Sequence, residues 1–154
     1  MIPKATDAID KHKQQSAEEW AKKVASEADA KASAEKAAED SLFVERYAGV
    51  SACFQDIHTA FEIGVNYLEF KSFVFNLKSE WNKVSNKPII ERHKYNIIDA
   101  QIAVDEYVKT LDFWGKSIND DAFKYTFSKY RDEHREKAMI KSKSFLSEYN
   151  SANN

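Results

Sequence analysis

The chain has 154 residues with 23 basic and 25 acidic side chains, a formal net charge of −2 and a single cysteine. This length suits one domain that buries roughly two thirds of its unfolded surface, and one cysteine excludes an intramolecular disulfide and a four-cysteine zinc site. The small net charge, with 19 lysines and four arginines, counts against a nucleic-acid-binding protein, because arginine is favoured for recognising phosphates and base edges.

Three glycines and two prolines in the whole chain are far below the average usage of about 7% and 5%. Hairpin turns and glycine-rich loops need more of both, so the composition predicts an all-α protein. The first residues contain no apolar core of a signal peptide, and no later run approaches the roughly 20 apolar residues of a membrane span. We therefore expect a cytoplasmic protein that does not enter the membrane.

The first predicted helix follows a flexible or loosely helical N-terminal segment, residues 1–15. Ser16 and Glu19 have the spacing of a capping box, in which the Ser16 hydroxyl accepts from the Glu19 amide. The helix is predicted to run from about Ala17 to Ala48, and Gly49 suits its left-handed C-cap.

This first helix is alanine-rich and carries a thin apolar stripe. Nine alanines lie between residues 17 and 38, and the large apolar side chains of the stripe are Trp20, Val24 and Leu42. Burying such a stripe stabilises little, so the helix propensity of alanine must supply much of the order. We expect weak packing, or a stalk or coiled coil that spaces or oligomerises the rest of the protein.

The second predicted helix is capped by Ser51 and ends near Val84. A Ser-Asn-Lys-Pro turn follows, and its Pro88 suits the first position of a third helix. That third helix is predicted to reach about Trp114 and to be stopped by Gly115.

The fourth predicted helix is capped by Asn119, and Asp120 and Asp121 in its first turn suit the positive end of the helix dipole. It is expected to run to about Tyr149, with residues 150–154 disordered.

Similar lengths and short connections predict an antiparallel up-down four-helix bundle, or long helical hairpins. Residues 16–149 then form a single helical domain. Its parts are the alanine-rich helix at 16–48 and an aromatic-rich three-helix core at 51–149.

The second and third predicted helices carry apolar side chains on two sides. With about 100° per residue, one side of the second helix is an ordinary core face made by Val50, Phe54, Ile57, Phe61, Gly64, Leu68 and Phe75. Past Tyr67 the apolar residues lie nearly opposite, at Phe70, Phe73, Val74, Leu77, Trp81 and Val84. The third helix repeats the pattern, with a second stripe of Tyr95, Ile98, Ile102 and Phe113.

Two explanations account for the surplus apolar faces. In the first, helices one and four cover them, or the second helix kinks near Gly64. In the second, the surplus stays exposed and is buried by a partner chain. The thin stripe of helix one favours the second explanation. The predicted partner-binding residues are Tyr67, Phe70, Phe73, Leu77, Trp81, Tyr95, Ile98, Ile102 and Phe113.

The fourth helix offers a basic strip of Lys124, Arg131 and Arg135 beside its apolar stripe. Such a strip suits phosphate or an acidic partner. A solvated flank paired at i to i+4 is the simpler interpretation.

No motif for catalysis, metal or cofactor binding is evident. His58 and Glu62 share a helical face and are interpreted as a surface pair, and His134 on the apolar stripe as a hydrogen-bonded boundary residue. His12 and His93 have charged neighbours and are predicted at the surface. Cys53 is expected to pack as a small hydrophobic residue. We expect no cofactor, no metal and no enzymatic activity.

The sequence therefore favours a non-enzymatic protein–protein interaction module, an inhibitor, adaptor or assembly factor, that binds another protein or itself. The alternative is a nucleic-acid or nucleoprotein accessory protein that uses the basic strip. Abundant lysine, asparagine and aromatic residues with scarce arginine suit an AT-rich genome, as many phages and plasmids have.

Overall fold

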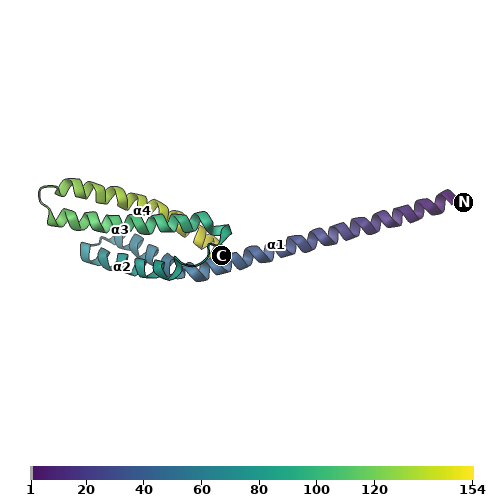
Figure 1. Cartoon of the computed structure of the whole chain (residues 1–154), viewed down its shortest axis with the longest axis horizontal. Coiled ribbons are helices and arrows are strands. Elements are labelled where there is room, and N and C mark those ends of the chain that lie inside the picture. The colour runs from purple at the N-terminus through teal and green to yellow at the C-terminus, as the bar shows by residue number, and fades with distance from the viewer. Residues whose placement is uncertain (1) are drawn as a thin grey trace. The chain divides into compact units, whose positions relative to one another are not determined.

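The structure is a computed structural model that describes residues 2–154, with side chains from Ala5 onward. Its described residues form helices and no strands, which confirms the predicted all-α class (Figure 1). The elements are α1 (Ile2–Ile63), α2 (Tyr67–Val84), the short 3-10 helix η1 (Glu91–His93), α3 (Lys94–Asn119) and α4 (Lys124–Asn153). Between Ile2 and Asn154, no helix has both the length and the apolar character needed to cross a bilayer.

The chain divides into two compact units, Met1–Ala38 and Glu39–Asn154, which we call unit 1 and unit 2. The boundary lies about ten residues before the predicted end of the alanine-rich helix. Part of the predicted first helix therefore belongs to unit 2.

Unit 1 is helical from Ile2 onward, and every side chain from Ala5 to residue 37 is exposed. Trp20 leaves 69% of its surface in solvent, and Ile9 and Val24 are also exposed. Local interactions, such as the Lys31–Glu35 ion pair at 3.9 Å, and the propensity of alanine stabilise this part of α1. The predicted capping box at Ser16 is not a helix start, because α1 begins at Ile2.

Unit 2 contains residues 39–63 of α1 packed with α2, α3 and α4 (Figure 1). Ring contacts connect Phe61 with Phe70, Phe70 with Trp114, and Phe54 with Phe145. The fully buried core includes Phe43, Phe54, Ile57, Phe70, Val74, Leu77, Tyr107 and Phe145.

Successive helices of unit 2 run antiparallel. For α1 and α2, Arg46 bonds to the carbonyl of Pro88, which follows α2, while Phe61 meets Phe70. For α2 and α3, Tyr67 at the start of α2 meets Trp114 near the end of α3. Along α3 and α4, Asp99 binds Lys141 while Phe113 meets Phe127. The Gly64–Asn66 and Asp120–Phe123 turns therefore lie at the same end of unit 2, which we call the distal end.

The predicted helix break at Gly49 and Ser51 is wrong. α1 continues to Ile63 because Phe43, Tyr47, Val50 and Phe54 form one unbroken buried stripe. Gly49 is a mid-helix residue, and a Cβ there would overlap the carboxylate of Glu80.

The actual break lies at Gly64, whose φ of 105° is in the region that favours glycine. Asn66 then caps α2: its side chain accepts from the Glu69 amide at 2.9 Å, and the Glu69 carboxylate accepts from the Asn66 amide at 3.2 Å. The reversal places the two apolar faces of the predicted second helix on separate helices. This explains why Leu68 and Phe75, predicted as core, are exposed.

Both ends of α3 also differ from prediction. Pro88 lies in the extended segment before η1, and α3 begins only at Lys94. Gly115 lies inside α3, where a Cβ would come 2.9 Å from the Tyr67 hydroxyl. Close helix packing, not a helix stop, is therefore the role of this glycine.

The α3–α4 turn is organised by Asp120 and not by the predicted cap Asn119, which is the last residue of α3. The Asp120 carboxylate accepts from the amides of Ala122 and Phe123 at 3.0 and 3.2 Å. At the other end α4 continues through Asn153, beyond the predicted limit at Tyr149.

Candidate functional site

The predicted partner-binding surface is dispersed by the reversal at Gly64. Phe70 and Leu77 are fully buried in the core of unit 2 and are therefore wrong as surface residues. Phe73 and Trp81 are half-buried and pack against the same core. The apolar side of α2 faces the core because α2 packs antiparallel against α1 and α3.

The remaining members of that predicted set come from the start of α2 and from α3. Tyr67 packs edge-on against Trp114, with ring centroids 6.0 Å apart. Phe113 is half-buried between α3 and α4, where its ring stacks on His134. Of the predicted residues, Tyr95, Ile98 and Ile102 are exposed.

A larger group of exposed apolar side chains lies at the distal end. α3 continues past Gly115, which faces Tyr67 at the start of α2. The α3–α4 hairpin therefore extends beyond the α1–α2 turn (Figure 1). We call the exposed large apolar residues at this end the distal patch: Ile63, Leu68, Ile118, Phe123, Tyr125 and Tyr130.

The protruding hairpin is supported by aromatic contacts between its two helices. Phe113 meets Phe127 and Tyr130 with centroids 6.3 and 5.3 Å apart, and Phe127 meets Phe123 at 6.4 Å. Such ring pairs add stability beyond their buried area. The hairpin tip is thus a packed structure and not a loose loop.

A cleft of about 270 Å³ lies where the protruding hairpin meets the α1–α2 turn. It is lined by Phe61, Gly64, Val65, Thr110, Trp114, Arg131 and Arg135. The Arg131 guanidinium lies over the Trp114 ring at 5.3 Å, and the Arg135 guanidinium lies over the Phe61 ring at 5.4 Å. We call this the arginine cleft.

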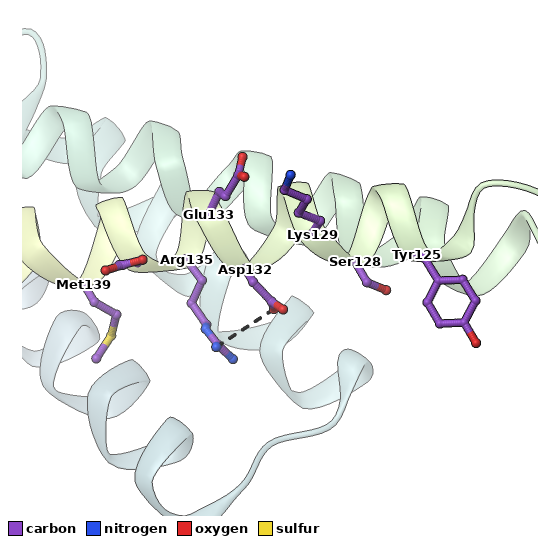
Figure 2. A pocket seen from close by; sticks show the side chains of 8 residues that line it. Tyr125, Ser128, Lys129, Asp132, Glu133, Arg135 and Met139 are labelled. Atoms are coloured by element: carbon purple, nitrogen blue, oxygen red, sulfur yellow. Dashed lines mark ion pairs between the residues drawn. The ribbon is translucent and has the colours of Figure 1, made fainter.

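The outer side of α4 beside this cleft forms a second, more open hollow. Figure 2 shows Tyr125, Ser128, Asp132 and Arg135 projecting from one side of the helix, while Glu133 projects from the other. Arg135 lines both the hollow and the cleft. Tyr125 is 89% exposed at the outer end of the hollow.

The three residues of the predicted basic strip therefore do not all line the same surface. Arg131 and Arg135 line one cleft, whereas Lys124 is exposed at the start of α4. Asp132 lies 3.0 Å from Nε of Arg131 and 3.9 Å from Nη2 of Arg135. Both arginines thus have a fixed carboxylate and a fixed ring beside them.

The half-buried His58 and the buried Ser142 and Tyr107 form a polar chain. Nε2 of His58 lies 2.6 Å from Oγ of Ser142, which lies 3.0 Å from the Tyr107 hydroxyl. Burial, with the charge of Lys143, lowers the pKa of His58. Ser142 and Tyr107 have no exposed surface, so this serine–histidine contact is closed to a substrate. His58 bonds to Ser142 and not to Glu62, contrary to the predicted surface pair.

His134 is hydrogen-bonded to Glu106 and stacks on Phe113, as its place on the boundary of the apolar stripe predicts. Burial raises the pKa of Glu106, but the hydrogen bond and charge of His134, with Lys109, outweigh it and leave the pKa lowered. This contact is a structural hydrogen bond between α3 and α4.

His93 is 1% exposed, so its predicted surface position is wrong. Its Nε2 lies 2.6 Å from Asp40, its Nδ1 lies 3.6 Å from Glu148, and its ring stacks on Phe43. The neighbours in sequence are charged, but packing of η1 against α1 and α4 buries the ring itself.

Cys53 packs against the core of unit 2, as predicted. Burial, reinforced by the charges of Glu80 and Asp56, raises the pKa of its thiol to about 11. The thiol is therefore protonated at neutral pH and a poor nucleophile. Among the described residues, no group of three histidine, cysteine, aspartate or glutamate side chains is arranged to hold a metal ion.

No protein-family model matches this sequence, and no curated protein and no solved structure is significantly similar to it. Its function is therefore argued from the geometry of its own residues.

The distal patch and the arginine cleft were missed from sequence because they depend on where α1 ends. A signal was present: Gly64 is followed by Asn66 and Glu69 at capping-box spacing. A helix that starts at Asn66 requires a chain reversal just before it. The α1–α2 hairpin is then shorter than the α3–α4 hairpin, whose end is left uncovered.

Proposed function

We propose that this chain is a non-enzymatic interaction protein that binds another protein through the distal patch. The observation that carries the proposal is the gathering of six large exposed apolar residues, three of them aromatic, at one end of unit 2. Scattered apolar residues are normal on surfaces, but large exposed apolar groupings mark interaction sites. Aromatic residues are also enriched in protein interfaces.

The charges of the same region favour a partner that combines apolar and acidic side chains. Between Lys116 and Arg131 the chain has four basic and two acidic residues, although its overall net charge is −2. Lys116 and Arg131 are paired with Asp112 and Asp132, so Lys124 and Lys129 carry the basic character of this region. One of the two acidic residues, Asp120, is engaged with backbone amides of the turn. Complementary charge on the partner would steer the encounter and fix its orientation.

The proposal is tested with a photo-crosslinking amino acid, p-benzoylphenylalanine, placed at Tyr125 in the native host. The control carries the same group at Ile140, which is exposed on α4 away from the distal patch. The purified partner is then titrated against the wild type and against a Phe123→Ser, Tyr125→Ser variant. We expect a protein crosslinked only at position 125, and a loss of affinity of about 10-fold or more in the variant, since buried aromatic anchors dominate interfaces.

A matched Tyr95→Ser variant distinguishes the distal patch from the α3 surface predicted from sequence. Affinity lost only in Tyr95→Ser would contradict the distal site. Crosslinking to nucleic acid, with affinity that falls steeply with salt and disappears when Lys124, Arg131 and Arg135 become alanine, would replace the proposal by the nucleic-acid alternative.

A second candidate function is self-association through unit 1, favoured by the 69% exposure of Trp20 on a helical segment whose described side chains, from Ala5 to Ala38, are exposed. A second copy would cover Trp20 and Val24. Sedimentation equilibrium of the wild type and of Trp20→Glu tests it: a wild type that is monomeric at micromolar concentration removes this candidate.

A further inference from the structure

The arginine cleft places two guanidinium groups over aromatic rings, beside an apolar wall. Arg131 lies over Trp114 and Arg135 over Phe61, with 5.3 and 5.4 Å between guanidinium carbon and ring centroid. Val65, from the α1–α2 turn, completes the apolar lining. Planar guanidinium groups stacked on rings are pre-organised, so less side-chain entropy is lost when they bind an anion.

The net charge of the cleft matches a monoanion. Asp132 interacts with both arginines, at 3.0 Å from Arg131 and 3.9 Å from Arg135. Two guanidinium charges and one carboxylate leave one positive charge. Each guanidinium has five N–H donors, so one carboxylate leaves several of them available to a ligand.

The shape and lining of the cleft favour an anion attached to an apolar group. The rings of Phe61 and Trp114 and the side chain of Val65 provide apolar contact, and a carboxylate fits the planar arginine fork. The volume of about 270 Å³ is near the lower end of small-ligand pockets. It suits one side chain or chain terminus better than a nucleotide.

We propose that the arginine cleft binds a carboxylate carried on an aromatic or aliphatic group, supplied by the protein partner as an acidic side chain beside an apolar residue or as a C-terminal carboxylate. The statement that a protein partner supplies this carboxylate rests on the proposed function. The binding chemistry rests on the cleft alone and is tested separately.

The first experiment uses 3-phenylpropionate as the probe and the Nε–H signals of arginine in ¹H–¹⁵N NMR as the readout. The chain has four arginines, and Arg46 and Arg92 are internal references because they bond to Pro88 and Asp40. We expect the signals of Arg131 and Arg135 to shift saturably while those references stay unchanged. Equal shifts of all four signals would overturn the proposal.

Matched ligands test the chemistry. 3-Phenylpropionamide keeps the ring and removes the charge, and inorganic phosphate keeps an anion and removes the ring. The proposal requires both to bind at least about 10-fold more weakly than 3-phenylpropionate. For the amide this is the factor expected from a lost charge-assisted hydrogen bond, and for phosphate it is the factor expected from lost apolar contact. Equal binding of the amide, or preferential binding of phosphate, would overturn it.

Matched variants test the residues. Arg135→Gln is expected to weaken 3-phenylpropionate binding about 10-fold or more, and Lys129→Gln, on the same helix but outside the cleft, to leave it unchanged. The circular dichroism spectrum of Arg135→Gln establishes that the variant is folded. Unchanged binding in a folded Arg135→Gln would overturn the assignment.

Two peptides separate the sources of the carboxylate. Acetyl-Gly-Gly-Phe with a free C-terminus presents a terminal carboxylate, and acetyl-Asp-Phe-Gly-amide presents a side-chain carboxylate. Saturable binding of either peptide supports a peptide ligand and identifies whether its carboxylate is terminal or on a side chain. If neither peptide binds while 3-phenylpropionate does, the proposal that a protein partner supplies the carboxylate is overturned. A partner crosslinked at Tyr125 that binds Arg135→Gln undiminished would overturn the role of the cleft and leave the proposed function intact.

Discussion

Nε2 of His93 lies 2.6 Å from Oδ1 of Asp40, so that η1 is joined to the first turns of α1 in unit 2. The imidazole also stacks on Phe43 with centroids 4.0 Å apart. We expect His93→Ala to lower the free energy of unfolding by about 2–4 kcal/mol, because it removes a buried ring and one of the two side-chain partners of the Asp40 carboxylate, the other being Arg92. Urea unfolding measures this. His12→Ala, at an exposed position in unit 1, is the control and should change stability by less than about 0.5 kcal/mol.

Asp40 makes the contact between η1 and α1 sensitive to acid. The hydrogen bond from Arg92, outweighing partial burial and aided by His93, holds the pKa of Asp40 below its ordinary value of 3.8. The folded state therefore favours the ionised carboxylate, and this stability is complete above about pH 4 and is lost as the pH falls through the folded-state pKa. The stability difference between wild type and Asp40→Asn should shrink in that acid range. A difference that stays constant from pH 7 to pH 2 would contradict the ion pair.

His58 should destabilise unit 2 in mild acid. Burial lowers the pKa of His58, so the unfolded chain binds the proton more tightly than the folded protein does. The contribution of neutral His58 to the free energy of unfolding is fully present above the unfolded-state pKa of about 6.5, and it declines as the pH falls below that value. Comparing unfolding free energies of wild type and His58→Gln at pH 7.5 and 5.5 removes the contributions of the other histidines. The wild type should lose more stability than the variant over this interval.

Gly64→Ala tests the turn that creates the arginine cleft. A Cβ at Gly64 would meet nothing within 4 Å, so the cost comes from the backbone, whose φ of 105° is unfavourable for alanine. We expect a loss of about 1–2 kcal/mol in thermal or urea unfolding. A neutral result would show that α1 and α2 are joined with a different turn conformation.

The sequence is sufficient for the helical class and for part of the core, because low glycine content and the stripe of Val50, Phe54 and Ile57 are local features. The predicted core faces do not include Phe43 and Tyr47, which extend this buried stripe across the predicted break at Gly49. The helix ends at Gly49 and Gly115 are mispredicted for a physical reason. These glycines accommodate Glu80 and the Tyr67 hydroxyl from neighbouring helices, and such close approaches have no local sequence signature.

The candidate site was less predictable than the fold. The arginine cleft brings Phe61, Trp114 and Arg131 together, and their distances in sequence carry no sign of that proximity. The predicted basic strip contains Arg131 and Arg135 together with Lys124, but the rings beneath the two arginines come from α3 and α1. His93 shows the same limit, since its partners Asp40 and Glu148 lie near opposite ends of unit 2 in sequence.

The aromatic contacts within the protruding hairpin have a consequence for the thermodynamics of association. Phe127 is held by Phe113 and Phe123 before any partner arrives, and the short turn is fixed by Asp120. Less conformational entropy is therefore lost at the hairpin tip when an interface forms there, since the backbone and the larger rings are already ordered. An interface of modest area at this tip would consequently retain more of its contact free energy as affinity than one formed by a flexible loop.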